Sequence, residues 1–245
     1  LVENSKFLNN KITGTPNRAL GGAIYNNQNL TIKNSEISNN SIEVTNRALG
    51  GGLATEAYFS GENLKFESNI ITGGFSKGGA IYGAGTIFVK NSVFDSNIVN
   101  GQNIALQDLT GGGAIYLNND GVATLIDSSF TNNAVNSENI WKGGGAIMAV
   151  DGSTVNIIAD SKNVVFEGNM LGSESNAITL KDAVLNLNAG NAGIFINDAI
   201  VNYRALSENA DATININQTG EWNTETDMQP PSHEETQDET TVKVW

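Results

Sequence analysis

The chain has 245 residues and a formal net charge of −13, with 26 acidic residues against 13 basic ones. It contains no cysteine, one histidine, 27 glycines and 36 asparagines, which excludes disulfides, thiolate metal sites and most imidazole chemistry. The small number of Lys and Arg residues argues against nucleic acid as a partner, because neutralising phosphates requires clusters of them.

Pairs of glycines followed by apolar residues recur along the chain. The second glycine of each pair is assigned to Gly22, Gly52, Gly79, Gly113 and Gly145, in steps of 27 to 34 residues. The residues after each pair, as in Ala23-Ile24-Tyr25, predict a short strand. The glycines predict a tight corner or a close approach of two backbones. The identical segments 17–21 and 46–50 indicate local duplication of a unit.

A second motif alternates with the glycine pairs and consists of an apolar residue followed three positions later by asparagine. Its members are Phe7/Asn10, Ile37/Asn40, Phe66/Asn69, Phe94/Asn97, Phe130/Asn133 and Phe166/Asn169. Insertions fall between the two motifs and never within them, which is typical of strands joined by loops. We expect Phe66, Phe94, Phe130 and Phe166 to form one buried column with Ile37. We expect Asn69, Asn97 and Asn133 to stack at a turn, and asparagines in register to hydrogen-bond from coil to coil.

These repeating units predict an all-β fold, a parallel β-helix that forms a single elongated domain. Runs with a period of two, such as Leu30–Ile32 and Ile87–Val89, indicate half-buried strands, and no segment has the apolar spacing of a helix. One unit cannot bury its apolar face alone. We therefore expect at least five coils to stack on one another.

The repeat becomes less regular after Asn169, where Ser175–Thr179 is expected to replace a Gly-Gly-Ala-Ile strand. Residues 1–223 are assigned to the β-helix. Residues 224–241 contain two prolines and six acidic residues and are assigned to an acidic loop or linker. Residues 242–245 are expected to begin a further strand. Because the pattern is already under way at Leu1, we expect the chain to be a piece of a longer protein.

The alternation of Gly-Gly-Ala-Ile with Phe-x-x-Asn resembles the repeats of the polymorphic outer-membrane proteins, which are chlamydial-type autotransporters. The resemblance covers roughly Phe7 to Asn169, with two departures: Gly51-Gly52-Leu53-Ala54 lacks the alanine, and Ile37 replaces a phenylalanine. It implies a secreted, often adhesive passenger with a right-handed parallel β-helix. Such a passenger is held at the bacterial cell surface and outer membrane by a separate C-terminal barrel absent from this chain, or is extracellular after release.

The sequence therefore favours a non-catalytic, adhesive surface passenger without catalytic residues, metal or cofactor. Its expected partner is a protein or glycan on a host or neighbouring cell. The longest insertions, Ile98–Leu109 and Ala134–Lys142, are the candidate binding loops, and they carry the candidate binding residues Asn103, Gln107, Asn139 and Trp141. Trp141 is either an exposed interface residue or a cap on the edge of the core.

Two alternatives stay open, a structural stalk that projects another module and a polysaccharide-cleaving β-helix enzyme. An enzyme would use Asp120 and Asp151, which follow equivalent strands and are expected to lie close together. The competing interpretation of both Asp-Gly pairs is turn chemistry. The chain has only three arginines that could bind an acidic polysaccharide, Arg18, Arg47 and Arg204. This small number further disfavours a polysaccharide-cleaving enzyme.

Overall fold

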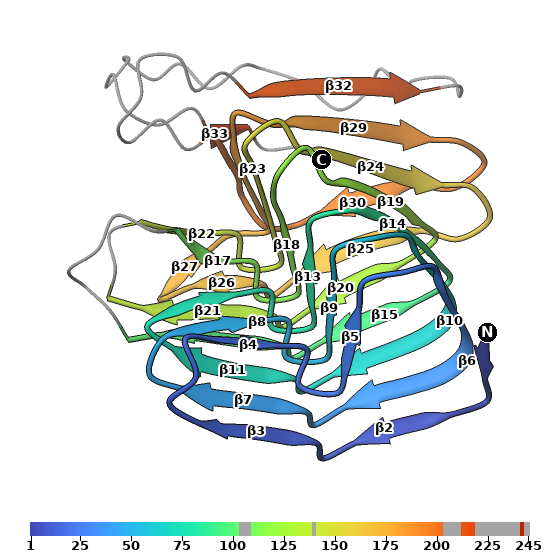
Figure 1. Cartoon of the computed structure of the whole chain (residues 1–245). Coiled ribbons are helices and arrows are strands. Elements are labelled where there is room, and N and C mark those ends of the chain that lie inside the picture. The colour runs from blue at the N-terminus through green and yellow to red at the C-terminus, as the bar shows by residue number, and fades with distance from the viewer. Residues whose placement is uncertain (103–108, 139–140, 203–211, 219–240, 243–245) are drawn as a thin grey trace.

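The structure is a computed structural model that describes residues 1–102, 109–138, 141–202, 212–218 and 241–242. Within these ranges every regular element is a strand, and no helix is long and apolar enough to cross a membrane. Successive coils of the chain stack into a β-solenoid of about seven turns, and their strands form parallel sheets (Figure 1). The predicted all-β parallel β-helix and the expected number of coils are both confirmed.

Four sheets, here called A to D, run along the solenoid. Sheet A consists of β1 (Val2–Glu3), β2 (Lys6–Leu8), β6 (Leu30–Ser38), β10 (Phe59–Glu67), β14 (Thr86–Lys90), β15 (Val93–Asp95), β19 (Val122–Ile126), β20 (Ser129–Thr131), β24 (Thr154–Ala159), β25 (Val164–Glu167), β29 (Val184–Ala189), β30 (Ile194–Ile196) and β32 (Thr213–Gln218). Sheet B consists of β3 (Lys11–Gly14), β7 (Ser41–Val44), β11 (Ile70–Gly73), β16 (Ile98–Gly101), β21 (Ala134–Ser137), β26 (Met170–Leu171) and β27 (Glu174–Ser175).

Sheet C consists of β4 (Arg18–Leu20), β8 (Arg47–Leu49), β12 (Phe75–Lys77), β17 (Thr110–Gly111) and β22 (Lys142–Gly143). Sheet D consists of β5 (Ile24–Asn26), β9 (Leu53–Thr55), β13 (Ile81–Gly83), β18 (Ile115–Leu117), β23 (Ile147–Val150), β28 (Ile178–Lys181), β31 (Ile200–Asn202) and β33 (Thr241–Val242). Two short pairs are antiparallel, β26 with β27 and β31 with β33. Of the expected strand at residues 242–245, only Val242 is described, and it lies in β33 together with Thr241, a residue of the segment assigned to the acidic loop or linker. Residues 224–240 and 243–245 lie outside the described ranges.

The predicted phenylalanine column is confirmed in sheet A. Its four phenylalanines are fully buried and stack nearly parallel, with ring centroids 4.6–4.9 Å apart, in the order Phe66, Phe94, Phe130 and Phe166. Ile37 pairs with Phe66 at one end of the column, and Ile196 pairs with Phe166 at the other. This spacing follows from the distance of about 4.8 Å between neighbouring strands.

The predicted asparagine ladder is also confirmed, at the turn between sheets A and B. Each Nδ2 donates to the Oδ1 of the next asparagine, over 2.8–3.0 Å, through Asn10, Asn40, Asn69, Asn97, Asn133 and Asn169. From Asn40 onward, each Nδ2 also donates to the backbone carbonyl of a residue in the preceding coil, as Asn97 does to Phe66. The ladder therefore satisfies polar groups that the coils bury.

The strand register corrects one of the glycine assignments. Leu53 pairs with both Ile24 and Ile81, so Gly51, and not Gly52, lies at the level of Gly22. Gly52 occupies the alanine position of the other coils, with its N–H bonded to the carbonyl of Ala80. Because residues 50–52 are all glycine, the sequence alone does not show which of them is level with Gly22. Ser175–Thr179 replaces a Gly-Gly-Ala-Ile strand as expected, because Ile178 pairs with Ile147.

The glycine column is required by a close approach of backbones between coils. A Cβ on Gly113 would lie 2.0 Å from the carbonyl oxygen of Gly145, and the equivalent distance from Gly79 to the carbonyl of Gly113 is 2.1 Å. The glycine before each of these has a positive φ, 66° at Gly112, a conformation that costs little without a Cβ. These two requirements create a sharp corner between sheets C and D.

Apolar side chains form two clusters inside the coil and a third outside it. The main core includes the phenylalanine column and inward residues of sheet D such as Ile81 and Ile115. A smaller core lies between sheets B and C and includes Ile42, Ile71 and Val99. The third group, called the outer cluster, lies in the corner between sheets C and D and consists of Leu49, Ala54, Tyr82, Leu109, Tyr116, Met148 and Val150.

Candidate functional site

Figure 1 shows sheets C and D meeting at an angle. Four residues of the outer cluster, Leu49, Tyr82, Leu109 and Tyr116, line a groove at this corner. The groove encloses about 370 Å³ and is lined by Arg18, Arg47, Leu49, Phe75, Lys77, Tyr82, Leu109, Tyr116, Asn118, Asn119 and Asp151. Successive side chains of a strand point to opposite faces. In β13, Ile81 therefore enters the main core while Tyr82 faces the corner.

Sheet C supplies one wall of the groove. Arg18 of β4 pairs with Arg47 of β8, and Arg47 pairs with Phe75 of β12. Leu109 and Trp141, which precede β17 and β22, continue this column toward the C-terminus. Sheet C thus carries two guanidinium groups at one end of the column and three large apolar side chains farther along.

Sheet D supplies the opposite wall and much of the floor. Tyr82 and Tyr116 pair in register on β13 and β18, with ring centroids 6.1 Å apart. Only 4% of Tyr82 and 1% of Tyr116 is exposed, so the rings form the base of the groove and not its rim. Buried aromatic rings on adjacent coils make this base rigid.

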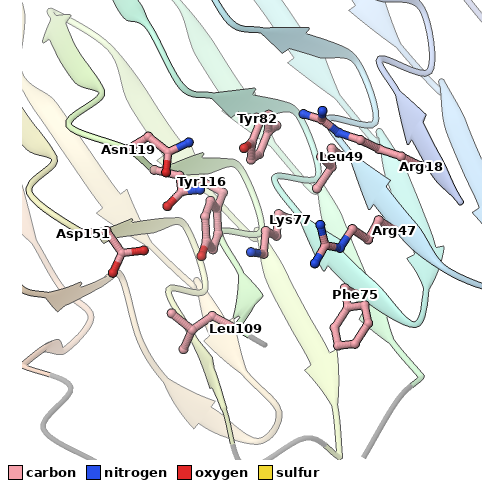
Figure 2. A pocket seen from close by; sticks show the side chains of 11 residues that line it. Arg18, Arg47, Leu49, Phe75, Lys77, Tyr82, Leu109, Tyr116, Asn119 and Asp151 are labelled. Atoms are coloured by element: carbon pink, nitrogen blue, oxygen red, sulfur yellow. The ribbon is translucent and has the colours of Figure 1, made fainter. Parts of the chain in front are cut away.

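The cations lie close to aromatic rings. The guanidinium carbon of Arg47 is 5.9 Å from the ring centroid of Phe75, and Nζ of Lys77 is 5.0 Å from that of Tyr116. Figure 2 shows the charged ends of Arg47 and Lys77 directed toward the Tyr116 side of the groove. Both residues are engaged in other interactions as well, so an incoming anion would exchange with existing contacts. Such rings hold a cation in place without neutralising its charge.

Arg18 is anchored at the N-terminal end by a carboxylate. It forms an ion pair with Glu56, and the hydroxyl of Tyr25 donates to the other oxygen of that carboxylate over 2.6 Å. The hydrogen bond from Tyr25, together with Arg18, holds the pKa of Glu56 below its ordinary value although burial raises it. The same hydrogen bond raises the pKa of Tyr25. Glu56 is therefore ionised at neutral pH and fixes the position of Arg18.

The other end of the groove is polar and carries one acid. Asn118 and Asn119 follow β18, and Asp151 occupies the equivalent turn after β23. Figure 2 shows Asn119 and Asp151 across the groove from Arg47 and Phe75. Oδ1 of Asp151 pairs with Nζ of Lys181 over 3.1 Å. This end offers amide groups and a paired carboxylate, which suit uncharged hydrogen-bonding groups of a ligand.

The placement of positive charge in this groove is unusual for so acidic a chain. Both arginines in the described residues, Arg18 and Arg47, lie here beside Lys77, while the net charge of the chain is −13. Like charges directly opposed on neighbouring strands destabilise a sheet. The ion pair of Arg18 with Glu56 and the contact of Arg47 with the Phe75 ring offset part of this cost, and two aligned guanidinium groups suit the binding of an anion.

The structure describes only part of the predicted binding loops. Ile98–Leu109 begins as strand β16 and Ala134–Lys142 as strand β21, so the insertions are shorter than predicted. Asn103, Gln107 and Asn139 lie outside the described residues. Trp141 is half-buried and packs against the outer cluster, which places it at the C-terminal continuation of the groove wall.

Asp120 and Asp151 lie on neighbouring coils, as expected, but one position out of register. Val122 pairs with Thr154, which puts Asp120 level with Gly152 and Asn119 level with Asp151. The backbone N–H of Asp120 donates to the carbonyl of Asp151 over 3.1 Å. Both aspartates are exposed and have positive φ, the geometry of turn residues. Within the described part of the chain no group of three or more His, Cys, Asp or Glu residues could hold a metal.

Sequence reasoning missed the groove, although one signal was present. The duplicated segments 17–21 and 46–50 place an arginine at the same position of two successive units, and these are two of three arginines in the chain. In a parallel stack, residues at the same position of successive repeat units lie side by side on neighbouring strands. What the repeat could not show is that the outward faces of sheets C and D turn toward each other.

In comparisons with known proteins, no family model, no curated protein and no solved structure matches this chain. Its function is therefore inferred from the groove, the solenoid and the repeat motifs.

Proposed function

We propose that this chain is a non-catalytic recognition module, the adhesive passenger of a bacterial outer-membrane protein similar to the polymorphic outer-membrane proteins. The observation that carries the proposal is the groove between sheets C and D, in which Arg18, Arg47 and Lys77 gather over a rigid aromatic base. The alternating repeat motifs support display at the cell surface. Repeat proteins commonly bind extended partners through such concave surfaces.

The groove suits binding better than chemistry. Among the described residues that line the groove, Asp151 is the one acid, and it is paired with Lys181. This described lining therefore does not present the two facing carboxylates of a glycoside hydrolase. Tyr82 and Tyr116 are packed among apolar neighbours. The residues of the groove are thus held in place by stacked coils, which reduces the ordering cost of binding a partner.

Attachment of the purified chain to cultured host cells and to a matrix coating tests this proposal. We expect attachment to fall at least several-fold in the double variant Arg47→Gln/Lys77→Gln. The matched control Lys33→Gln/Lys65→Gln removes two charges from sheet A, where Lys33 and Lys65 form surface ion pairs, and should attach like the parent chain.

Three results would overturn the proposal. Absence of attachment by the parent chain would favour the structural stalk. Equal attachment by both double variants would show that the groove takes no part in recognition. Cleavage of a polysaccharide by the parent chain, lost in Asp120→Asn or Asp151→Asn, would favour the enzyme.

A further inference from the structure

We propose that the groove binds a carboxylate-bearing sugar, with the carboxylate at Arg47 and Lys77 and the hydroxyls at the turn that follows sheet D. This inference rests on the proposed function, because it names the ligand class of the same groove. It follows from how charge, amides and apolar surface are distributed along the groove.

The cationic end fits a single carboxylate. Arg18 and Arg47 pair directly on neighbouring coils, where strands lie about 4.8 Å apart, and Lys77 lies on the next coil, level with Leu49. Arg47 and Lys77 point toward the Tyr116 side of the groove (Figure 2), and a bound carboxylate would exchange with the contacts that both residues already make. A planar guanidinium recognises a carboxylate through two parallel hydrogen bonds, and an adjacent ammonium adds a third.

The opposite end fits hydroxyl groups. The amides of Asn118 and Asn119 can donate and accept, and Oδ2 of Asp151 can accept while Oδ1 stays paired with Lys181. Among the described lining residues, the cations Arg18, Arg47 and Lys77 lie at one end of the groove, and Asp151 lies at the other, where it is paired with Lys181. A uniformly anionic peptide or polymer would meet Asp151, whereas a sugar with one carboxylate and several hydroxyls matches both ends.

The size and the floor of the groove agree with this ligand. A volume of about 370 Å³ lies at the lower end of the range for small-molecule sites and suits one or two sugar units. Leu49, Leu109 and Tyr116 form an apolar base against which the C–H face of a sugar ring can pack. The rim residues Arg18, Arg47 and Asn119 are exposed, so a ligand can reach the site without opening the fold.

Calorimetric titration of the full chain with 3′-sialyllactose, with digalacturonate and with lactose tests the inference. We expect at least one acidic sugar to bind about tenfold or more tightly than lactose, and comparison of the two distinguishes a terminal sialic acid from a uronic acid. Arg47→Gln should weaken binding at least about tenfold, as loss of a charge-assisted hydrogen bond predicts. Lys33→Gln, which removes a cation of sheet A, should leave the affinity unchanged within twofold.

Asn119→Ala tests the other end of the groove. This change should weaken binding of the acidic sugars while Arg47 and Lys77 stay unchanged. Thermal unfolding of each variant shows whether the fold is retained, as exposure of Arg47 and Asn119 leads us to expect. Equal binding of lactose and both acidic sugars would overturn the inference. Binding of a hexaglutamate peptide in place of the sugars, or the absence of any binding, would overturn it as well.

The two proposals fail in different ways. If cells are bound through Arg47 and Lys77 but no acidic sugar binds the chain, the ligand class is wrong and the recognition function stands. If an acidic sugar binds in an Arg47-dependent manner but the chain attaches to no cell or matrix, the site is real and the adhesive function is wrong.

Discussion

Asn169 donates two hydrogen bonds to one oxygen of Asp198, from its backbone nitrogen over 2.9 Å and from Nδ2 over 2.8 Å. Asp198 thus takes the acceptor role of the next asparagine in the ladder. A carboxyl group has no N–H with which to donate to a further ladder residue, so the amide ladder of the described coils ends at Asp198. The other oxygen of Asp198 accepts from the hydroxyl of Ser175 over 3.0 Å.

Replacing Asp198 by alanine should destabilise the C-terminal coils. The change leaves two buried donors of Asn169 without a partner, at a cost of about 1–3 kcal/mol in the free energy of unfolding. Asp198→Asn is the matched control, because its side-chain oxygen can accept both bonds as the other ladder residues do. Urea unfolding measures both variants, and an equal loss in the two would contradict this role for Asp198.

Phe94→Ala should be among the most damaging single changes in the core. Phe94 is fully buried between Phe66 and Phe130, with centroid distances of 4.9 and 4.7 Å, and its removal should cost ~3–5 kcal/mol. Phe88 lies on the outward face of the preceding strand and is only half-buried. Phe88→Ala should therefore lower the unfolding midpoint by less than half as much, and similar losses would argue against the assigned column.

Gly113→Ala should prevent close stacking of two coils. The added Cβ would lie 2.0 Å from the carbonyl oxygen of Gly145 and 2.7 Å from the backbone nitrogen of Ala134. Overpacking of this kind costs roughly 1–3 kcal/mol or more. At Gly190 the nearest atom would be 3.1 Å away, so Gly190→Ala is the control. Circular dichroism during heating distinguishes them, and an unchanged midpoint for Gly113→Ala would refute the close approach.

Asp127 should make the stability of the solenoid sensitive to acid. Burial by itself raises the pKa of Asp127, but its hydrogen bonds outweigh burial and hold the pKa below the ordinary value of 3.8. They come from the hydroxyl of Ser161 and from the backbone nitrogens of Asp160, Ser161 and Lys162. A lowered folded-state pKa means that the carboxylate stabilises the fold fully above about pH 4, and that this contribution disappears as the pH falls through the lower folded-state value.

Unfolding midpoints of the parent chain and of Asp127→Asn, measured between pH 2 and pH 6, test this role. The variant should be less stable at pH 6, and the difference should shrink as the pH is lowered. A constant difference across this range would show that the charge of Asp127 makes no contribution.

The phenylalanine and asparagine columns could be predicted because a parallel coil places residues of equal repeat position above one another. The period and the residue types therefore indicated Phe94 on Phe130 and Asn97 on Asn133, as the structure shows. Asn also recurs just before several ladder positions, where Asn9, Asn39 and Asn132 adopt positive φ. Local backbone preference explains this second use of asparagine.

Register within the glycine run and the position of the groove were decided only by tertiary structure. Three consecutive glycines fit either register in sequence, and the contact between Gly51 and the carbonyl of Gly79 selects one. The groove needs outward side chains of sheets C and D to face each other across a sharp corner, and side chains as distant in sequence as Arg47 and Asp151 line it together. A repeat period determines which residues stack along the solenoid, whereas the angle between its sheets depends on how the whole coil packs.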